Sequence, residues 1–345
     1  MITERMKTFL MDAKSRKASD IHICAGAPVM YRVGKKLIRA SHGALTPDLA
    51  QELCYSLLTE PQLEEFKKTF DYDLMLADDD GRYRVNISVN NGCVGSVIRL
   101  LPEEPKTIDG LRLPIVVREL SHRTKGLVLI TGSTCQGKTT TMSAMIAEIN
   151  ATERKHIVTI EDPIEVVHVN KQGIVRQREV GKDTQSFHSA LRAALRQDPD
   201  VLAIGEMRDY ETIRIALTAA ETGMLVVSTL HIISIDKLID RLLSYAPAEE
   251  EGHVRNLLAD CLQGIIHQEL VPALDGGKRV ACEILVATDA TRNIIRKRGT
   301  NMLRNVLATG TKYGMVTMSQ SIEALLNENA ITPEVAEGIM ANYTK

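Results

Sequence analysis

The first part of the chain, residues 1–101, combines two helical patterns with many short alternating runs of apolar and polar residues. Apolar positions spaced three and four apart predict a helix over Thr3–Ala13. A second helix is expected to begin at Thr46, since threonine caps helix starts and Pro47 tolerates the first turn. The expected strands are Asp20–Cys24, Val29–Val33, Lys36–Ala40, Asp71–Leu76, Arg82–Val89 and Cys93–Leu101. With turns expected at 78–81 and 90–92, the pattern predicts a small α+β domain around an antiparallel sheet.

The second part of the chain has a different pattern. Residues 102–114 carry three prolines and several charges, which is typical of an interdomain linker. Short apolar runs then alternate with longer helical patterns over residues 115–345, which predicts parallel strands with helices on both faces of the sheet. The apolar runs are Gly126–Thr131, Ile157–Ile160, Val201–Ile204 and Leu225–Leu230. From Ala287 to the end the pattern is mostly helical.

Composition narrows the class of protein further. The 345 residues are 44% hydrophobic, contain no tryptophan and carry a formal net charge of −2. A chain of this balance shows no basic field for nucleic acid, and no apolar run reaches the ~18 residues that a membrane span needs. None of the six cysteines forms a C-x-x-C pair, so a zinc ribbon is not indicated. We therefore expect a soluble, cytoplasmic protein that does not bind nucleic acid.

One segment predicts a phosphate-binding loop. It fits the pattern G-x-x-x-x-G-K-[ST], and it follows an apolar strand and precedes a helical run. Backbone N–H groups of such a loop face a triphosphate, Lys138 would reach the β- and γ-phosphates, and the hydroxyl of Thr139 would bind Mg²⁺. The expected nucleotide-binding residues are Gly132, Ser133, Thr134, Cys135, Gln136, Gly137, Lys138, Thr139 and Thr140.

Acidic residues follow two of the later strands. The segment Ile160–Glu165 closes one apolar strand with three carboxylates, and the segment Val201–Asp209 places Glu206 after another. Open α/β sheets bind ligands at the carboxyl ends of their strands, so these residues are candidates for holding Mg²⁺ or orienting the attacking water. Acidic loops are common, so these two segments alone would be weak evidence for a nucleotide site. The phosphate-binding loop that precedes them strengthens this interpretation.

Together these segments resemble the secretion and pilus ATPases, and most closely the PilT-like branch that retracts type IV pili. The resemblance also covers Ala18–His22, Gln177–Val180, Ala190–Arg192, Gly205–Asp209 and Ala219–Gly223, and so runs along nearly the whole chain. It implies an α/β protein with a PAS-like N-terminal domain, followed by a RecA-like ATPase domain with a helical C-terminal part.

The resemblance assigns roles to individual residues. Glu165 matches the general base for the attacking water, and Glu206 matches the Walker B acid that supports Mg²⁺. His231, at the end of the His box, is placed near the γ-phosphate. Arg84 and Arg99 match a pair of arginine fingers that stabilise charge on the phosphoryl oxygens. An alternative interpretation of these two arginines, as solvated strand side chains, stays open.

The function implied by the resemblance is a ring motor, a hexamer in this family, that hydrolyses ATP with Mg²⁺ to retract a type IV pilus. It would work in the cytoplasm at the inner membrane, where a pilus platform protein would be its partner. Two alternatives stay open. One is an assembly or secretion ATPase, although the missing four-cysteine module argues against it. The other is an accessory nucleotide-binding protein of the PilU-like kind.

The sequence departs from the pattern of the PilT-like branch in three places. Within the phosphate-binding loop, Ser133, Cys135 and Gln136 replace Pro, Gly and Ser. Met224 stands where the His box has its earlier histidine, which would remove one polar contact. A C-terminal motif linked to retraction keeps its arginines but ends in Lys297 instead of Glu.

Cys135 has two interpretations. One is a reactive thiol whose alkylation blocks the loop and from which ATP protects it. The other is a small, shielded residue that only fits the loop.

Overall fold

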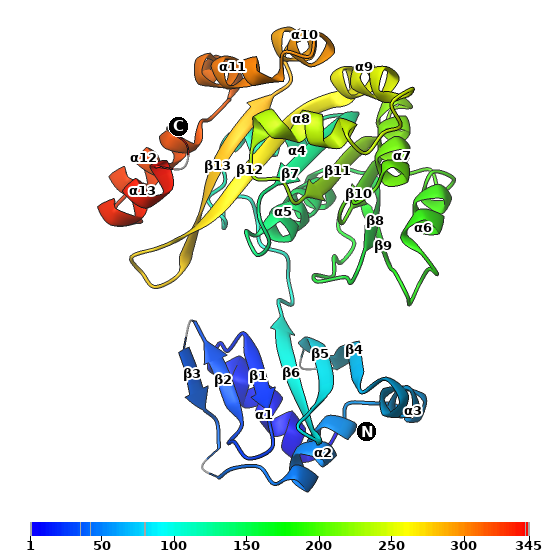
Figure 1. Cartoon of the computed structure of the whole chain (residues 1–345), viewed down its shortest axis with the longest axis vertical. Helices are drawn as coiled ribbons and strands as arrows, with labels where there is room; N and C mark the ends of the chain where they lie inside the picture. Colours follow the sequence, from blue (N-terminus) through cyan, green and yellow to red (C-terminus); the bar gives the residue numbers. More distant parts are fainter. Residues whose placement is uncertain (1, 35, 42, 79–80, 342, 344–345) are drawn as a thin grey trace. The chain divides into compact units, whose positions relative to one another are not determined.

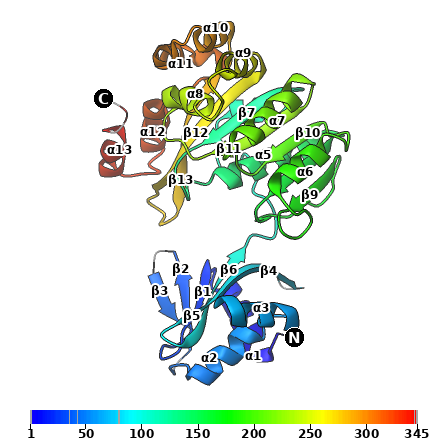
Figure 2. The same cartoon turned by 45° about the vertical axis from the view of Figure 1, so that its right-hand side comes forward.

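The computed structural model describes residues 2–34, 36–41, 43–78, 81–341 and 343. The chain divides into two compact units, Met1–Glu103 and Glu104–Lys345, each built around its own sheet (Figures 1 and 2). Each unit also has its own cluster of buried apolar side chains, so that each one encloses a core of its own.

The first unit contains a six-stranded sheet in which every pairing is antiparallel, in the order β3-β2-β1-β6-β5-β4. Its strands are β1 (Asp20–Ile23), β2 (Met30–Val33), β3 (Lys36–Arg39), β4 (Asp71–Asp78), β5 (Gly81–Asn90) and β6 (Cys93–Leu101). Its helices are α1 (Glu4–Ser15), α2 (Pro47–Tyr55) and α3 (Glu60–Thr69). Buried side chains alternate with more exposed ones along β5 from Tyr83 to Ser88 and along β6 from Ser96 to Arg99, so one face of the sheet is turned to the core.

The local predictions for this unit are confirmed in most details. All six expected strands are present, and Thr46 caps α2 by accepting a hydrogen bond from the N–H of Leu49, with Pro47 at the first position. The expected turn at 90–92 contains Asn91 and Gly92, both with positive φ. The expected turn at 78–81 includes Asp79 and Asp80, which lie outside the described residues. The helix α3 was not predicted.

The second unit contains a seven-stranded sheet in the order β13-β12-β7-β11-β10-β8-β9. Its strands are β7 (Gly126–Thr131), β8 (His156–Glu161), β9 (Ile174–Glu179), β10 (Val201–Ile204), β11 (Leu225–Leu230), β12 (Leu262–Pro272) and β13 (Lys278–Val286). The strands from β12 to β9 run parallel, which confirms the prediction for β7, β8, β10 and β11, whereas β9 and β12 were not predicted. The antiparallel strand β13, which forms a hairpin with β12, was not predicted.

The second unit also contains helices before, between and after these strands in the sequence. They are α4 (Ile115–Ser121), α5 (Lys138–Thr152), α6 (Phe187–Ala194), α7 (Tyr210–Glu221), α8 (Ile235–Leu243), α9 (Glu251–Cys261), α10 (Asp289–Arg296), α11 (Leu303–Thr309), α12 (Met318–Asn327) and α13 (Pro333–Met340). α5 packs with α4, whereas α7 packs with α6 and α9, and both α5 and α7 contact β7 and β11. With right-handed crossovers, this places the two groups on opposite faces of the sheet. The mostly helical C-terminal part is confirmed.

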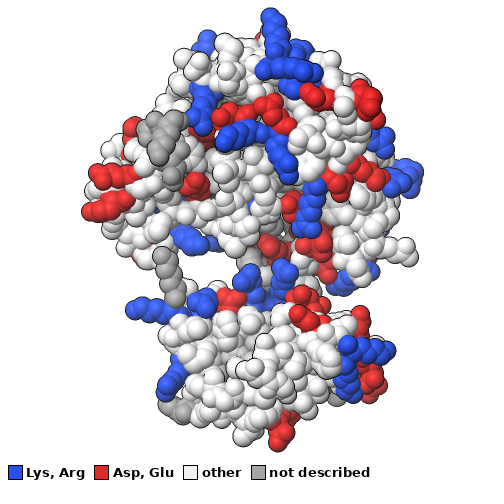
Figure 3. Space-filling model, viewed as in Figure 1, with Lys and Arg blue, Asp and Glu red and all other residues white. Residues whose placement is uncertain are grey.

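The segment expected as a linker joins the second unit in its later half. Residues 102–114 form neither helix nor strand, but Ile108 and Leu113 are buried in the core of the second unit. Basic and acidic side chains are mixed over the viewed face of this unit (Figure 3). Among the described residues, none of the helices combines the length and the apolarity that crossing a bilayer requires.

Candidate active site

The phosphate-binding loop connects the fully buried strand β7 to the start of α5. Two of its glycines meet backbone requirements. Gly132 has φ near +145°, and a Cβ at this position would lie 2.5 Å from the carbonyl oxygen of Gln268. Gly137 has φ near +81° and turns the chain into the helix. Cys135 also has a positive φ, +62°, and its side chain is exposed.

Lys138 is the first residue of α5, and its side chain is held inside the loop. Its Nζ donates to the carbonyl oxygens of Gly132 at 2.9 Å and Ser133 at 2.8 Å. It also lies 3.2 Å from Nδ1 of His231. Burial lowers the pKa of Lys138, while the negative charge of Glu206 acts in the opposite direction. The ammonium group thus lies at the centre of the curled loop.

His231 links the loop to Glu206. Its Nδ1 faces Lys138, and its Nε2 lies 3.3 Å from Oε1 of Glu206. Because an ammonium group can only donate, Nδ1 is the acceptor and Nε2 carries the hydrogen toward the carboxylate. The other carboxylate oxygen of Glu206 accepts from Nε of Arg208 at 2.8 Å. Three segments far apart in the sequence therefore meet in one row of contacts.

The topology explains this meeting. β7, β8, β10 and β11 are parallel, so their carboxyl ends lie at one edge of the sheet. The loop follows β7, Glu206 comes two residues after β10, and His231 directly follows β11. Ligands of open α/β sheets bind at this edge. Met224, in contrast, precedes β11, and its carbonyl accepts from Gly126 at the amino end of β7.

This position corrects one expectation about the His box. β11 is six residues long, so Met224 and His231 lie a full strand length apart, roughly 20 Å at ~3.3 Å per residue. The side chain at 224 is at the amino edge of the sheet. A methionine there removes no contact with the loop within this subunit.

The three acidic residues that follow the core of β8 have different surroundings. Glu161 is buried, and its Oε1 accepts from Thr159 Oγ1 at 2.6 Å and Gln177 Nε2 at 3.0 Å. Asp162 is exposed. Glu165 is partly buried and, within the described part of the chain, its carboxylate forms no hydrogen bond or ion pair. The carboxylate of Glu165 therefore remains available to an incoming water.

Thr139 and Glu206 have the chemistry that Mg²⁺ requires. The hydroxyl of Thr139 lies in the first turn of α5 and makes no side-chain hydrogen bond among the described residues. Mg²⁺ is commonly held by one or two protein oxygens together with phosphates and waters, so no cage of protein carboxylates is needed. Among the described residues, no group of three or more His, Cys, Asp or Glu side chains could hold a metal ion. The hydroxyl oxygen of Thr139 and the carboxylate of Glu206 are suitable ligands for Mg²⁺.

Gln136, one of the unusual loop residues, ties the loop to β12. Its side-chain Oε1 accepts from the N–H of Leu270 at 2.5 Å, and its carbonyl oxygen accepts from Nε2 of Gln268 at 2.6 Å. A serine would be too short to reach the backbone of β12. This replacement therefore adds an anchor for the loop.

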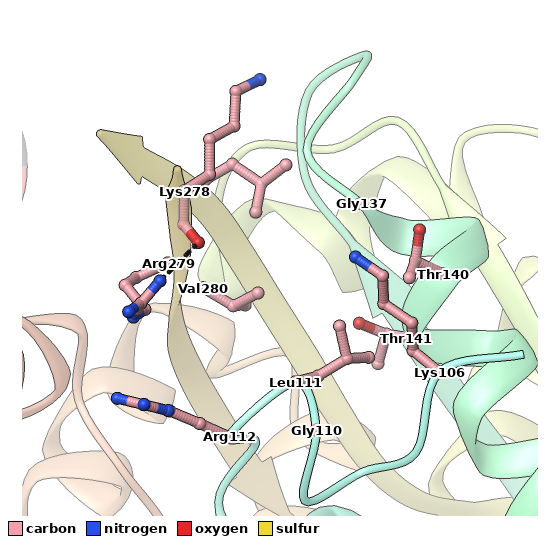
Figure 4. A pocket seen from close by; sticks show the side chains of 11 residues that line it. Lys106, Gly110, Leu111, Arg112, Gly137, Thr140, Thr141, Lys278, Arg279 and Val280 are labelled. Carbon is pink, nitrogen blue, oxygen red and sulfur yellow. Dashed lines mark hydrogen bonds between the residues drawn. The ribbon is translucent and has the colours of Figure 1, made fainter. Parts of the chain in front are cut away.

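A cavity of about 440 Å³ opens beside the amino end of α5 (Figure 4). Lys106 points toward Gly137 and Thr140, and Arg112 and Arg279 also line the cavity. Its walls also include Leu111, Leu270 and Val280. Sequence reasoning missed these residues, because they come from the connection after the first unit and from the β12–β13 hairpin.

Arg84 and Arg99 belong to the first unit. They lie directly opposite each other on β5 and β6, so both side chains project from the same face, and both are exposed. Arg99 Nε donates to Oδ1 of the buried Asp20 at 2.9 Å. Within the described residues Arg84 forms no ion pair. Two opposed cations repel each other, so this pair is suited to share an anion.

Comparisons with known proteins agree with this geometry. A family model described as "Type II/IV secretion system protein" matches residues 1–341. The type IV pilus retraction ATPase PilT of Pseudomonas aeruginosa is 42% identical over 320 residues, which cover 92% of this chain and 93% of that protein. A twitching motility protein of Neisseria gonorrhoeae is 40% identical over 309 residues, covering 89% and 83% of the two chains.

A solved structure matches over almost the full length as well. The crystal structure of the pilus retraction motor PilT with bound ADP has a TM-score of 0.88 to this chain at 42% identity. The match covers 95% of this chain and 94% of the other. The fold is therefore shared across both units, and the neighbour binds an adenine nucleotide.

Proposed function

Because this chain belongs to the family of type II/IV secretion system proteins, we propose that it is the ATP-hydrolysing motor that powers retraction of a type IV pilus. The observation that carries the proposal is the row of contacts from Lys138 through His231 to Glu206 at the carboxyl edge of the sheet. A strand-loop-helix of this kind cradles phosphates with backbone N–H groups and a lysine.

The chemistry follows from charge. In hydrolysis of ATP, Lys138 neutralises the β- and γ-phosphates, and Glu165 takes the proton of the attacking water. His231 lies between Lys138 and Glu206, where it can contact the γ-phosphate. Thr139 and Glu206 would hold Mg²⁺, which would supply positive charge to the phosphate oxygens. Arg84 and Arg99 are proposed to add positive charge as arginine fingers.

The cavity beside α5 is proposed to take the nucleoside end of ATP. It adjoins Gly137 and Thr140, so it continues from the loop that holds the phosphates. Its size falls in the usual range for small-ligand sites, roughly 300–1,000 Å³. Leu111, Leu270 and Val280 offer an apolar surface to a base, and the surrounding cations suit the ribose and phosphate end.

The assembly is proposed by family membership. We propose a ring of identical subunits, six in number, acting in the cytoplasm against a pilus platform protein of the inner membrane. A ring suits an enzyme in which the arginine fingers and the phosphate-binding loop belong to separate units.

One assay tests the proposed activity. Purified wild-type protein should release phosphate from ATP in a Mg²⁺-dependent way, and Lys138→Ala should abolish this release because the phosphates lose their main point charge. A strain that lacks the gene should not twitch. Complementation with the wild-type gene should restore twitching, and complementation with Lys138→Ala should not. Normal turnover by Lys138→Ala would refute the phosphate-binding role. Normal twitching in the deletion strain would refute the role in retraction.

A further inference from the structure

The loop that carries Glu165 is fastened on both sides of that residue by side chains of β9. The N–H of Ile164 donates to Oε2 of Glu179 at 3.1 Å. The carbonyl oxygen of Val166 accepts from Nε2 of Gln177 at 2.8 Å. Glu165 stands between these two bonded residues. The main chain that orients it is thus fixed by two side chains from a neighbouring strand.

Gln177 contributes the larger share of these contacts. Its Nε2 also donates to Oε1 of Glu161, and its Oε1 accepts from the N–H of His168 at 2.7 Å. Both hydrogens of the amide and its oxygen are therefore in use, and no other side chain of this length supplies two donors and one acceptor in that arrangement. Gln177 connects the end of β8 to two points of the loop.

Buried side chains of the loop itself also fix its position. Ile164 and Val166 are each 8% exposed. The ring of His168 is buried as well, and its Nε2 lies 3.1 Å from Oγ of Ser143 on α5, the helix that follows the phosphate-binding loop. The loop is thus fixed between β9 and α5, while the carboxylate of Glu165 has no partner of its own among the described residues.

We propose that Gln177 is a positioning residue for hydrolysis, which sets the backbone around Glu165 so that its carboxylate faces the attacking water. This proposal rests on the proposed function, in which Glu165 is the general base. It also assigns Glu161 to the support of the loop, because its oxygen is bound by Thr159 and Gln177. A general base must lie within hydrogen-bond reach of its proton, and a displacement of about 1 Å can cost about 100-fold in rate.

The variants Gln177→Ala and Gln177→Glu test the proposal in the full-length protein. Alanine removes all three contacts, whereas glutamate keeps the side-chain length and the acceptor for His168 but loses both donors. Each variant should lower kcat by about 10- to 100-fold. The Kd for ATP should stay within about twofold, because the phosphate-binding loop is not touched. Arg176→Ala, an exposed neighbour on β9, is the matched control and should keep the kcat of the wild type.

A double-mutant cycle with Glu165→Gln separates positioning from general structural damage. If Gln177 acts through Glu165, Gln177→Ala should cause no further loss of kcat in the Glu165→Gln background. An equal fold-loss in both backgrounds would overturn the proposal, as would a wild-type kcat in both Gln177 variants. Unchanged thermal unfolding of Gln177→Glu would show that the variant is folded.

Failure of the proposed function gives a different result. In that case wild-type protein and the Arg176→Ala control release no phosphate from ATP, whatever residue stands at 177. If the Glu165→Gln variant hydrolyses ATP at the rate of the wild type, the protein is still an ATPase, but Glu165 is not the general base. The positioning role of Gln177 depends on that base, so this result also overturns the proposal.

Discussion

At the scale of single residues, the loop residue Cys135 combines exposure with a position inside the proposed phosphate cradle. Only Cys24 and Cys135 are exposed among the six cysteines. Alkylation of nucleotide-free protein should therefore label both, and ATP should protect Cys135 alone, because bound phosphates cover the loop. Labelling at Cys135 should abolish phosphate release. Peptide mass spectrometry with and without ATP measures the protection, and Cys24 is the internal reference.

The variant Cys135→Gly is the control for this experiment. Glycine suits the positive φ of +62° at this position, so the loop should form without strain and the variant should keep its activity after alkylation. If Cys24 is labelled while Cys135 is not, or if ATP leaves labelling at Cys135 unchanged, the cysteine is only a loop residue.

His267 predicts how stability depends on pH. It is 1% exposed, with its ring nitrogens facing the hydroxyl groups of Thr131 and Tyr343. Burial, with a smaller effect from Lys138, lowers the pKa of His267 to about 4. In the unfolded chain the ring takes a proton near pH ~6.5, so protonation favours unfolding below this pH. Stability is therefore retained above about pH 6.5 and lost as the pH falls toward 4.

Urea unfolding between about pH 7 and about pH 5 measures this loss, which should approach about 1.4 kcal/mol per pH unit for one such histidine. His267→Gln should lose less stability over the same interval, although the buried His168, whose pKa is also lowered by burial to about 4, keeps the loss above zero. The exposed His253 gives the control, and His253→Gln should follow the wild type. Equal pH dependence in all three proteins would contradict the prediction.

The residue scale also separates what the sequence could predict from what it could not. The phosphate-binding loop was predictable because its residues are consecutive and its glycines meet local backbone requirements. The contacts of Gln136 with β12, and of Gln177 with the Glu165 loop, join residues that are far apart in sequence or come from separate strands. No local pattern reports such a contact. These contacts of Gln136 and Gln177 could be found only from the three-dimensional structure.

At the scale of elements, predictions succeeded where burial follows a simple period. β5 and the second half of β6 alternate between buried and more exposed side chains, and β7, β10 and β11 are buried throughout. β12 was missed because two polar residues, His267 and Gln268, stand in its middle although they are almost fully buried. Both side chains form hydrogen bonds with residues of other elements, which take the place of hydrogen bonds to water. α3 was missed because Phe66 is its only buried residue, which leaves no apolar stripe to detect.

Arg292 carries an element-scale prediction. From α10, its Nη1 donates to the carbonyl oxygens of Ala259 at 2.6 Å and Asp260 at 2.5 Å, near the C-terminus of α9. A cation there satisfies helix carbonyls and opposes the negative end of the helix dipole. Arg292→Ala should lower the free energy of unfolding by about 1–3 kcal/mol, while ATP affinity stays unchanged.

Thermal and urea unfolding measure this effect, and the exposed Lys297 supplies the control variant Lys297→Ala. The result also bears on the C-terminal motif. If Arg292→Ala unfolds like the wild type, the arginine does not stabilise α9 and its part in the motif has another basis.

At the scale of the whole molecule, the two units have separate cores, and the proposed chemistry draws on residues of both. Arg84→Ala and Arg99→Ala, in the first unit, should each lower kcat by about 10³-fold or more if they act as arginine fingers. The Kd for ATP should change little, because the phosphate-binding loop lies in the second unit. Phosphate release and nucleotide titration of full-length protein give the two quantities.

Asp20→Asn refines the test, since it keeps the shape of the partner of Arg99 but removes its charge. Its effect should resemble a weaker form of Arg99→Ala. Arg5→Ala, an exposed change on α1, is the control. If both finger variants hydrolyse ATP at the rate of the wild type, the two arginines are ordinary solvated side chains, the alternative that the sequence left open.

The central position of β7 has a consequence for how the chain folds while it is being synthesised. β7 pairs with β11 and β12, whose residues follow it by roughly 100 and 140 positions. At a translation rate of ~5–20 residues per second, the strand that leads into the phosphate-binding loop stays unpaired for about 5 to 30 seconds until its neighbours are synthesised. The first unit closes from residues 1–103 alone. It can therefore fold on the ribosome while β7 is still an unpaired apolar segment, a natural client for a chaperone.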